Sequence, residues 1–191
     1  MRIIAGTYRG RILASPRDLS VRPTTDRAKQ TIFDILTNRI GFDGLRVLDL
    51  FSGTGSLGLE AISRGVATAT FVDRSRDSEE LLRKNIRALD CENQCTLYQA
   101  DVFWYLKNTR AQFDLIFVDP PYKLENIGSL PRAIHESGVM SDNAFVVMEH
   151  SRDSVIDIDE TTYEVTRKPF GQTTVLILRN KKGRGEAEQL S

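Results

Sequence analysis

From Leu45 onward, short apolar segments alternate with longer segments of helical periodicity, and this alternation limits the possible folds more than any other feature. Strands separated by helices of such length predict βαβ units and a parallel sheet. The expected strands are 45–51, 68–73, 95–99, 113–119 and 143–149, and the expected helices are about 56–64, 76–89, 101–109 and 128–137. Two further strand-like runs, 161–168 and 172–180, follow each other without a helix, which predicts an antiparallel hairpin at one edge.

The first 40 residues precede this pattern and form a small extension. Residues 2–13 alternate around two glycines, which predicts a β-hairpin or two short strands. A loop over 16–23 leads to a helix that begins at the capping oxygens of residues 24–26. We therefore expect an extension over 1–40, a core domain over 41–180 and a disordered tail over 181–191.

Charge is distributed unevenly, although the formal net charge of the chain is zero. The first 30 residues hold two acidic and seven basic residues, the latter being Arg2, Arg9, Arg11, Arg17, Arg22, Arg27 and Lys29. A basic arm on an acidic body is typical of a surface that follows a phosphate backbone, and a solvated hairpin with clustered arginines is the alternative. The candidate RNA contacts are Arg2, Arg9, Arg11, Arg22 and Arg27.

Cysteine and hydropathy patterns exclude several classes of protein. Cys91 and Cys95 form an isolated C-x3-C without a second pair or a nearby histidine, so we expect reduced thiols and no bound metal. No apolar run approaches the roughly 18 residues that a membrane span needs. We expect a cytoplasmic monomer that makes no contact with membranes.

A glycine-rich turn follows the first expected strand, where residues 48–58 contain G-x-G-x-x-G. Gly53 and Gly55 let the backbone turn tightly and let a ligand approach closely. Asp73 closes the second strand, and a carboxylate there can accept hydrogen bonds from both hydroxyls of a ribose. This pattern fits an adenosine-type ligand, and by itself it suits a nicotinamide dehydrogenase as well as a methyltransferase.

Two further acids are expected near the ligand, and Asp49 favours the methyl donor S-adenosylmethionine over a dinucleotide. Asp49 lies four residues before Gly53, where it suits the ammonium group of a methionine moiety better than a pyrophosphate. Asp101 and Val102 follow the third strand, where Asp101 can accept from the adenine amino group while Val102 packs on the ring. Asp101 can also be a simple helix N-cap, and both roles can hold at once.

The fourth strand runs into Asp119-Pro120-Pro121-Tyr122, which points to methylation of a base amino group. Such a nitrogen is a poor nucleophile, and two acceptors on its hydrogens favour the pyramidal geometry that it needs to attack a sulfonium methyl. Asp119 provides one acceptor and the Pro120 carbonyl the other, while the prolines restrict the turn. Tyr122 offers a face for stacking on an extruded base. After transfer, Asp119 or water takes the proton. The alternative is a proline-rich turn with an incidental acid.

The chain resembles the RsmD-type 16S rRNA guanine-N2 methyltransferases to about Asn180. The residues that carry the resemblance are Arg2-Ile3-Ile4-Ala5-Gly6, Arg9-Gly10, Arg22-Pro23-Thr24-Thr25-Asp26-Arg27, Leu48-Asp49-Leu50-Phe51-Ser52-Gly53-Thr54-Gly55, Gly58-Leu59-Glu60-Ala61, Phe71-Val72-Asp73, Asn85 and Asp119-Pro120-Pro121-Tyr122. Family members often have Ala at Ser52 and Ser56 and Ser at Thr54, and these small-for-small changes keep the donor site credible.

The resemblance implies a class I S-adenosylmethionine-dependent methyltransferase fold, a Rossmann-like, mostly parallel seven-stranded sheet. It also implies methylation of a guanine N2 in 16S rRNA, of the guanine 966 type, with the assembled small ribosomal subunit as substrate. By position, Asp49, Phe51, Gly53 and Gly55 would line the methionine part of the donor, Asp73 the ribose, Asp101 and Val102 the adenine, and Asp119 to Tyr122 the base. A DNA amino-methyltransferase stays open, although the short extension leaves little room for target recognition.

Overall fold

The computed structural model describes residues 1–15, 26–121 and 124–181. The predicted loop at 16–23, with Arg17 and Arg22, as well as Tyr122 and the predicted tail beyond Lys181, lie outside the described residues. The chain divides into two compact units, Met1–Val102 and Phe103–Ser191. The extension and the glycine-rich turn belong to the first unit, and the Asp119-Pro120-Pro121 segment belongs to the second. The domain boundary expected at residue 40 stays a prediction.

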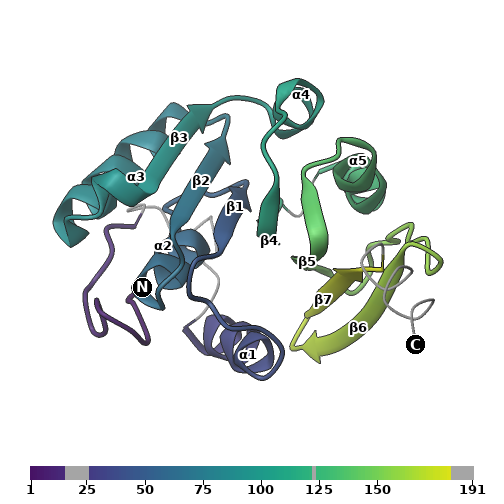
Figure 1. The fold of residues 1–191 in the computed structure, drawn as a ribbon, viewed down its shortest axis with the longest axis horizontal. Coiled ribbons are helices and arrows are strands. Elements are labelled where there is room, and N and C mark those ends of the chain that lie inside the picture. Colours follow the sequence, from purple (N-terminus) through teal and green to yellow (C-terminus); the bar gives the residue numbers. More distant parts are fainter. Residues whose placement is uncertain (16–25, 122–123, 182–191) are drawn as a thin grey trace, which may run out of the picture. The chain divides into compact units, whose positions relative to one another are not determined.

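The first unit is built on three parallel strands, β1 (Arg46–Leu50), β2 (Thr68–Asp73) and β3 (Cys95–Gln99), with β2 in the middle. Its helices are α1 (Asp26–Thr37), α2 (Ser56–Ser63), α3 (Arg76–Leu89) and the short 3-10 helix η1 (Glu92–Gln94). α3 lies along β2 and β3, as Figure 1 shows. It buries one face, and the Ser75 hydroxyl caps its first turn by accepting from the Ser78 amide at 3.3 Å.

The second unit contains β4 (Phe113–Val118), β5 (Met140–Ser151), β6 (Tyr163–Phe170) and β7 (Thr173–Asn180). Its helical segments are α4 (Val102–Asn108), whose first residue still belongs to the first unit, η2 (Ile127–Ser129) and α5 (Leu130–Glu136). β5 pairs in parallel with β4 and antiparallel with β7, and β6 pairs antiparallel with β7. The antiparallel hairpin predicted at the end of the chain is therefore confirmed.

The described residues form a seven-stranded sheet with the strand order β3-β2-β1-β4-β5-β7-β6. The predicted strands are confirmed, with β5 longer at both ends than the 143–149 that apolar periodicity indicated. The helix predicted over 128–137 is divided between η2 and α5, and Pro131 occupies the first turn of α5. Every residue of β1 except Arg46 is buried, which explains why Val47, Leu48 and Leu50 are apolar.

The N-terminal extension pairs with itself at a single antiparallel bridge, Arg2 with Ile12, instead of forming two regular strands. The predicted hairpin is thus present in a reduced form, because much of its backbone bonds to α2. The Ile4 and Ala5 amides donate to Glu60, and the Thr7 amide donates to the Ser63 carbonyl at 2.8 Å. The extension is anchored to the helix that follows the glycine-rich turn.

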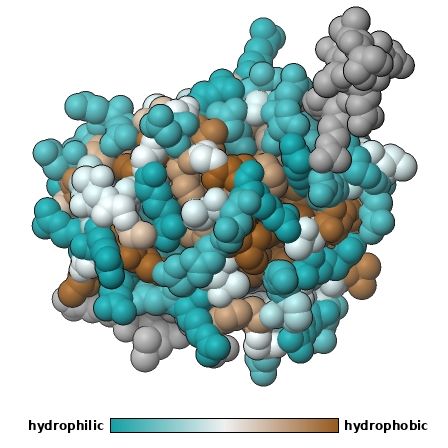
Figure 2. Space-filling view, turned by 60° about the horizontal axis from the view of Figure 1, so that its bottom comes forward, coloured by the Kyte–Doolittle hydropathy of each residue, from teal (hydrophilic) through white to brown (hydrophobic). Residues whose placement is uncertain are grey.

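Polar side chains cover most of the face drawn in Figure 2, and apolar surface shows there only in patches between them. Across the described parts of the chain, no helix is both long enough and apolar enough to cross a membrane.

Candidate active site

The glycine-rich turn between β1 and α2 contains three residues in the left-handed region of backbone conformation. Phe51, Gly53 and Gly55 have φ values of 57, 52 and 80°. This conformation suits glycine, but it is uncommon for a bulky side chain such as Phe51. Strained residues of this kind cluster at binding sites, and this one lies directly after the first strand.

The glycines of this turn serve two different purposes. A Cβ at Gly53 would have the Phe51 carbonyl oxygen, 4.0 Å away, as its nearest described neighbour, so the backbone there faces open space. A Cβ at Gly58 would lie 2.4 Å from the Phe71 ring and 3.0 Å from Asp49 Oδ2. Gly58 is therefore required by packing, whereas Gly53 leaves room for a ligand to approach the backbone.

The two acids expected at the donor both lie against this turn. Asp49 is 2% exposed, and its Oδ2 accepts from the Gly58 amide at 2.9 Å. Asp73 bridges two segments, because its Oδ2 accepts from the Gly53 amide and its Oδ1 from the Ser75 amide, each at 2.8 Å. Both carboxylates thus hold the turn in shape, a role that the sequence patterns did not indicate. A carboxylate has about four acceptor sites, so these bonds are compatible with ligand binding.

Two serine hydroxyls in the turn give an independent indication of a polar ligand. The Oγ atoms of Ser52 and Ser56 are buried and have no hydrogen-bond partner among the described residues. A buried hydroxyl without a partner is costly, and a ligand atom can satisfy it. Together with the open backbone at Gly53, these hydroxyls fit the polar methionine end of S-adenosylmethionine.

The segment expected at the adenine follows β3. Ala100 donates its amide to the Asp73 carbonyl oxygen at 3.1 Å, which ties the ends of β2 and β3 together. Asp101 is exposed and directly precedes α4, whereas Val102 is 3% exposed. Asp101 therefore occupies the helix-capping position, and its contact with adenine stays a prediction.

In the second unit, the Asp119-Pro120-Pro121 segment follows β4 directly. Asp119 is half-buried, Pro120 is buried and Pro121 is exposed. The Leu124 amide donates to the Pro121 carbonyl oxygen at 2.9 Å. This geometry leaves Asp119 at the end of a buried strand, as the sequence predicted.

Glu149 of β5 is a candidate site residue that sequence reasoning did not select. Burial and the nearby Asp119 carboxylate raise its pKa to about 7, against a smaller lowering by a hydrogen bond with the Thr173 side chain. Perturbed carboxyl groups of this kind are typical of functional sites. The only sequence signal was the position of Glu149 at the end of a strand.

The basic arm is only partly available to a nucleic acid. Arg2, Arg9, Arg11 and Arg27 are exposed. Lys29 is fully buried, since its Nζ donates to the Arg2 carbonyl oxygen at 2.6 Å and lies 3.3 Å from Glu60 Oε2. Counting Lys29 as part of the basic surface was therefore wrong, because its charge is neutralised inside the first unit.

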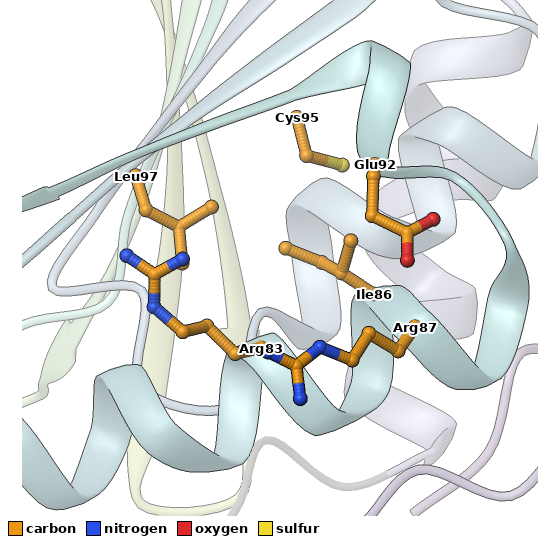
Figure 3. Close-up of a pocket in the computed structure, with 6 residues that line it drawn as sticks. All are labelled: Arg83, Ile86, Arg87, Glu92, Cys95 and Leu97. Atoms are coloured by element: carbon orange, nitrogen blue, oxygen red, sulfur yellow. The ribbon is translucent and has the colours of Figure 1, made fainter.

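The first unit contains a hollow of about 240 Å³, and Figure 3 shows the residues that line it. Its walls are formed by Arg83, Ile86, Arg87, Glu92, Cys95 and Leu97. None of the predicted donor-binding or base-binding residues lines it. Cys91 and Cys95 are free thiols, with their sulfur atoms 3.8 Å apart.

Comparisons with known proteins agree with this reading of the fold. The family described as "Conserved hypothetical protein 95" matches residues 1–179. "Putative rRNA methyltransferase YlbH" of Bacillus subtilis is 37% identical over 95% of this chain and 100% of its own length. "Ribosomal RNA small subunit methyltransferase D" of Escherichia coli is 29% identical over 98% of this chain and 93% of its own.

Solved structures give the same result. The solved structure titled "Putative methyltransferase yhhF from Escherichia coli" superposes with a TM-score of 0.83 at 29% identity, covering 94% of this chain and 97% of its own. The seven-stranded sheet is accordingly the Rossmann-like sheet of class I methyltransferases. By sequence, fold and the geometry of its glycine-rich turn, the chain belongs to the RsmD family of S-adenosylmethionine-dependent methyltransferases.

Proposed function

We propose that this chain transfers a methyl group from S-adenosylmethionine to the exocyclic N2 of a guanine in 16S rRNA, during biogenesis of the small ribosomal subunit in the cytoplasm. The observation that carries the proposal is Asp119 at the end of β4, followed by two prolines, in a chain whose relatives are named as methyltransferases of ribosomal RNA. The finer assignment to guanine 966 follows from the family resemblance.

The donor is held by the first unit. Its polar methionine end meets Asp49, Phe51, Gly53 and Gly55, where two buried hydroxyls require partners. Asp73 accepts from the ribose hydroxyls, and Asp101 and Val102 bind the adenine. This assignment is supported by the open backbone at Gly53 and by the position of each acid near the carboxyl end of a parallel strand.

S-adenosylmethionine supplies an electrophilic methyl group on a sulfonium. The residues of this chain make the base amino group reactive toward it: Asp119 and the Pro120 carbonyl accept its two hydrogens, and Tyr122 stacks on the extruded base. Asp119 is followed by a buried proline, so little reorganisation accompanies the reaction. Arg2, Arg9, Arg11, Arg22 and Arg27 contact the RNA backbone.

Methyl transfer to small subunits from a strain that lacks the modification tests the proposal. Purified protein with labelled donor should label the 16S rRNA, and mass spectrometry of the released nucleosides should identify N2-methylguanosine. D119A should bind S-adenosylhomocysteine normally and lose at least about 100-fold in transfer. D142A removes an exposed acid of β5 and is the matched control that keeps full activity.

Three outcomes would overturn the proposal. Full transfer by D119A would refute the role of that residue. Methylation of duplex DNA in preference to small subunits would instead identify a DNA amino-methyltransferase, and binding of NAD in place of S-adenosylhomocysteine would exclude a methyltransferase.

A further inference from the structure

Three polar side chains of the second unit share one face of the sheet at the carboxyl end of β4. β4 and β5 pair in parallel up to Val118 with Met148, so Asp119 and Glu149 are the next residues on each strand. Side chains at equivalent positions of paired strands point to the same face. On the other side of β5, Glu149 pairs with Val175 of β7, and Thr173 lies two residues away on that same face. We call Asp119, Glu149 and Thr173 the strand-end cluster.

Glu149 is incompletely satisfied within this cluster. Its Oε2 is buried and has no hydrogen-bond partner in the described part of the chain. The Thr173 side chain forms a hydrogen bond that lowers the pKa of Glu149, in competition with the bond that its hydroxyl donates to the Phe170 carbonyl oxygen at 3.0 Å. A buried carboxylate oxygen without a donor is costly, and such a group is retained where a proton or a ligand arrives.

Charge in the cluster comes from the two carboxyl groups. Among the described residues, Asp119 is the charged neighbour that acts on Glu149, and together with burial it raises the pKa of Glu149 to about 7. The next ionisable residue of β5, His150, points to the opposite face, and its Nδ1 lies 2.8 Å from the Ser151 carbonyl oxygen. Near neutral pH, Glu149 therefore gains and loses a proton easily, next to the acid that grips the target amino group.

We propose that Glu149 is a positioning residue for methyl transfer that acts through Asp119, by taking up from Asp119 the proton that the target amino group releases. This inference rests on the proposed function of Asp119 and deepens it, because it names the destination of that proton.

Methyl transfer forms one bond, breaks one bond and releases one proton. The lone pair of the amino nitrogen forms the new nitrogen–carbon bond, while the electrons of the sulfur–carbon bond remain on sulfur and give S-adenosylhomocysteine. One of the two nitrogen-bound protons passes to the Asp119 carboxylate and from there to the ionised Glu149. Glu149 then releases it to water before the next cycle. An ionised Glu149 also raises the affinity of Asp119 for the proton, because the two charges repel.

Single-turnover methyl transfer between pH 5.5 and 9, at saturating donor, tests the inference. The wild-type rate should rise about tenfold from pH 6 to pH 8, since only the ionised form of Glu149 can take up the proton. E149Q should be flat over this range and at least about tenfold slower at pH 8. E149D keeps a carboxylate and should restore the pH dependence, and H150N is the control that behaves as wild type.

A second variant keeps the test decisive if E149Q does not fold. T173V removes the hydroxyl whose hydrogen bond lowers the pKa of Glu149, so its rate profile should shift to higher pH. Affinity for S-adenosylhomocysteine should stay unchanged in every variant. A wild-type pH profile in folded E149Q, or an unshifted profile in T173V, overturns the inference. If D119A is inactive in the same assay, the proposed function survives that result, whereas an active D119A refutes both.

Discussion

Asn85 of α3 pairs with the backbone of Ala14 in both directions. Its Oδ1 accepts from the Ala14 amide at 2.7 Å, and its Nδ2 donates to the Ala14 carbonyl oxygen at 3.1 Å. The same Nδ2 donates to the Thr54 carbonyl oxygen at 2.9 Å. One buried amide thus joins the end of the N-terminal extension to the glycine-rich turn.

Replacing Asn85 should weaken both stability and donor binding. N85A leaves three backbone groups without their partners, so the free energy of unfolding in urea should fall by about 2–4 kcal/mol. Because Thr54 lies in the glycine-rich turn, affinity for S-adenosylhomocysteine should also fall severalfold in calorimetric titration.

Two further variants show whether the loss of stability in N85A comes from the hydrogen bonds of Asn85. N85D keeps the acceptor but turns a carboxylate toward two carbonyl oxygens, and it should be at least as unstable as N85A. N108A removes an exposed amide that donates to the Trp104 carbonyl oxygen, and it should change stability by less than about 0.5 kcal/mol. Equal stabilities of N85A and N108A would contradict the joining role of Asn85.

Much of the fold could be predicted because the strands of this sheet are short and apolar. β1 and β4 are almost fully buried, so most of their residues are apolar and the strands stand out in the sequence. The first and last residues of β5 could not be predicted in this way. The strand begins at Met140 and passes through exposed Asp142 and Asn143, the latter with φ of 62°, where its register with β4 shifts. A polar, irregular strand start resembles a turn in sequence.

The site was predictable where one motif carries the chemistry, and not where distant segments meet. Asp73 and Asp119 were identified because each acid ends or directly follows an apolar strand, and Asp49 was identified because it lies four residues before Gly53. The pKa of Glu149 is raised first by burial and then by Asp119, thirty positions away, and no local pattern reveals such a neighbour. Lys29 was assigned to the surface for the same reason, since its partner Glu60 lies on a different helix.

Alanine variants of Gly53 and Gly58 should distinguish a glycine that leaves room for the ligand from a glycine that core packing requires. G53A places a Cβ in open space at a φ of 52°, so it should cost about 1 kcal/mol in stability and weaken S-adenosylhomocysteine binding at least about tenfold. G58A forces a Cβ against the Phe71 ring and should destabilise the fold by more than G53A does. Urea unfolding and calorimetric titration of both variants measure this, and unchanged donor affinity in G53A would place the ligand elsewhere.

Stability should depend on pH through Glu149. Its pKa is raised from 4.5 to about 7 on folding, so between these values the folded state holds more protons than the unfolded state. The free energy of unfolding therefore falls as pH rises from 4.5 to 7, by at most about 3 kcal/mol, with a smaller loss where solvent reaches the side chain. E149Q lacks this titration, so its stability relative to wild type should increase from pH 5 to pH 8 in urea unfolding. A constant difference between the two proteins would show that Glu149 is not the titrating group.

Charge on the extension should govern RNA affinity without affecting the donor. Arg9 and Arg11 are exposed beside the bridge between Arg2 and Ile12, where they can neutralise phosphates and release counterions. R9E/R11E should therefore weaken binding to a 16S rRNA fragment, and the slope of log affinity against log salt should decrease by about two, one for each lost contact.

The matched control for this double variant reverses two other exposed charges, Lys107 in the last turn of α4 and Arg110 just beyond that helix. K107E/R110E changes the net charge by the same amount as R9E/R11E. If net charge alone governs RNA affinity, the two double variants should weaken RNA binding equally. If the extension contacts phosphates, only R9E/R11E should weaken it. Affinity for S-adenosylhomocysteine should be the same in both, because neither pair is near the glycine-rich turn in sequence or in its hydrogen bonds. An unaltered salt slope in R9E/R11E would show that Arg9 and Arg11 do not contact phosphates. The extension would then have only the structural role that its bonds to Glu60 and Asn85 indicate.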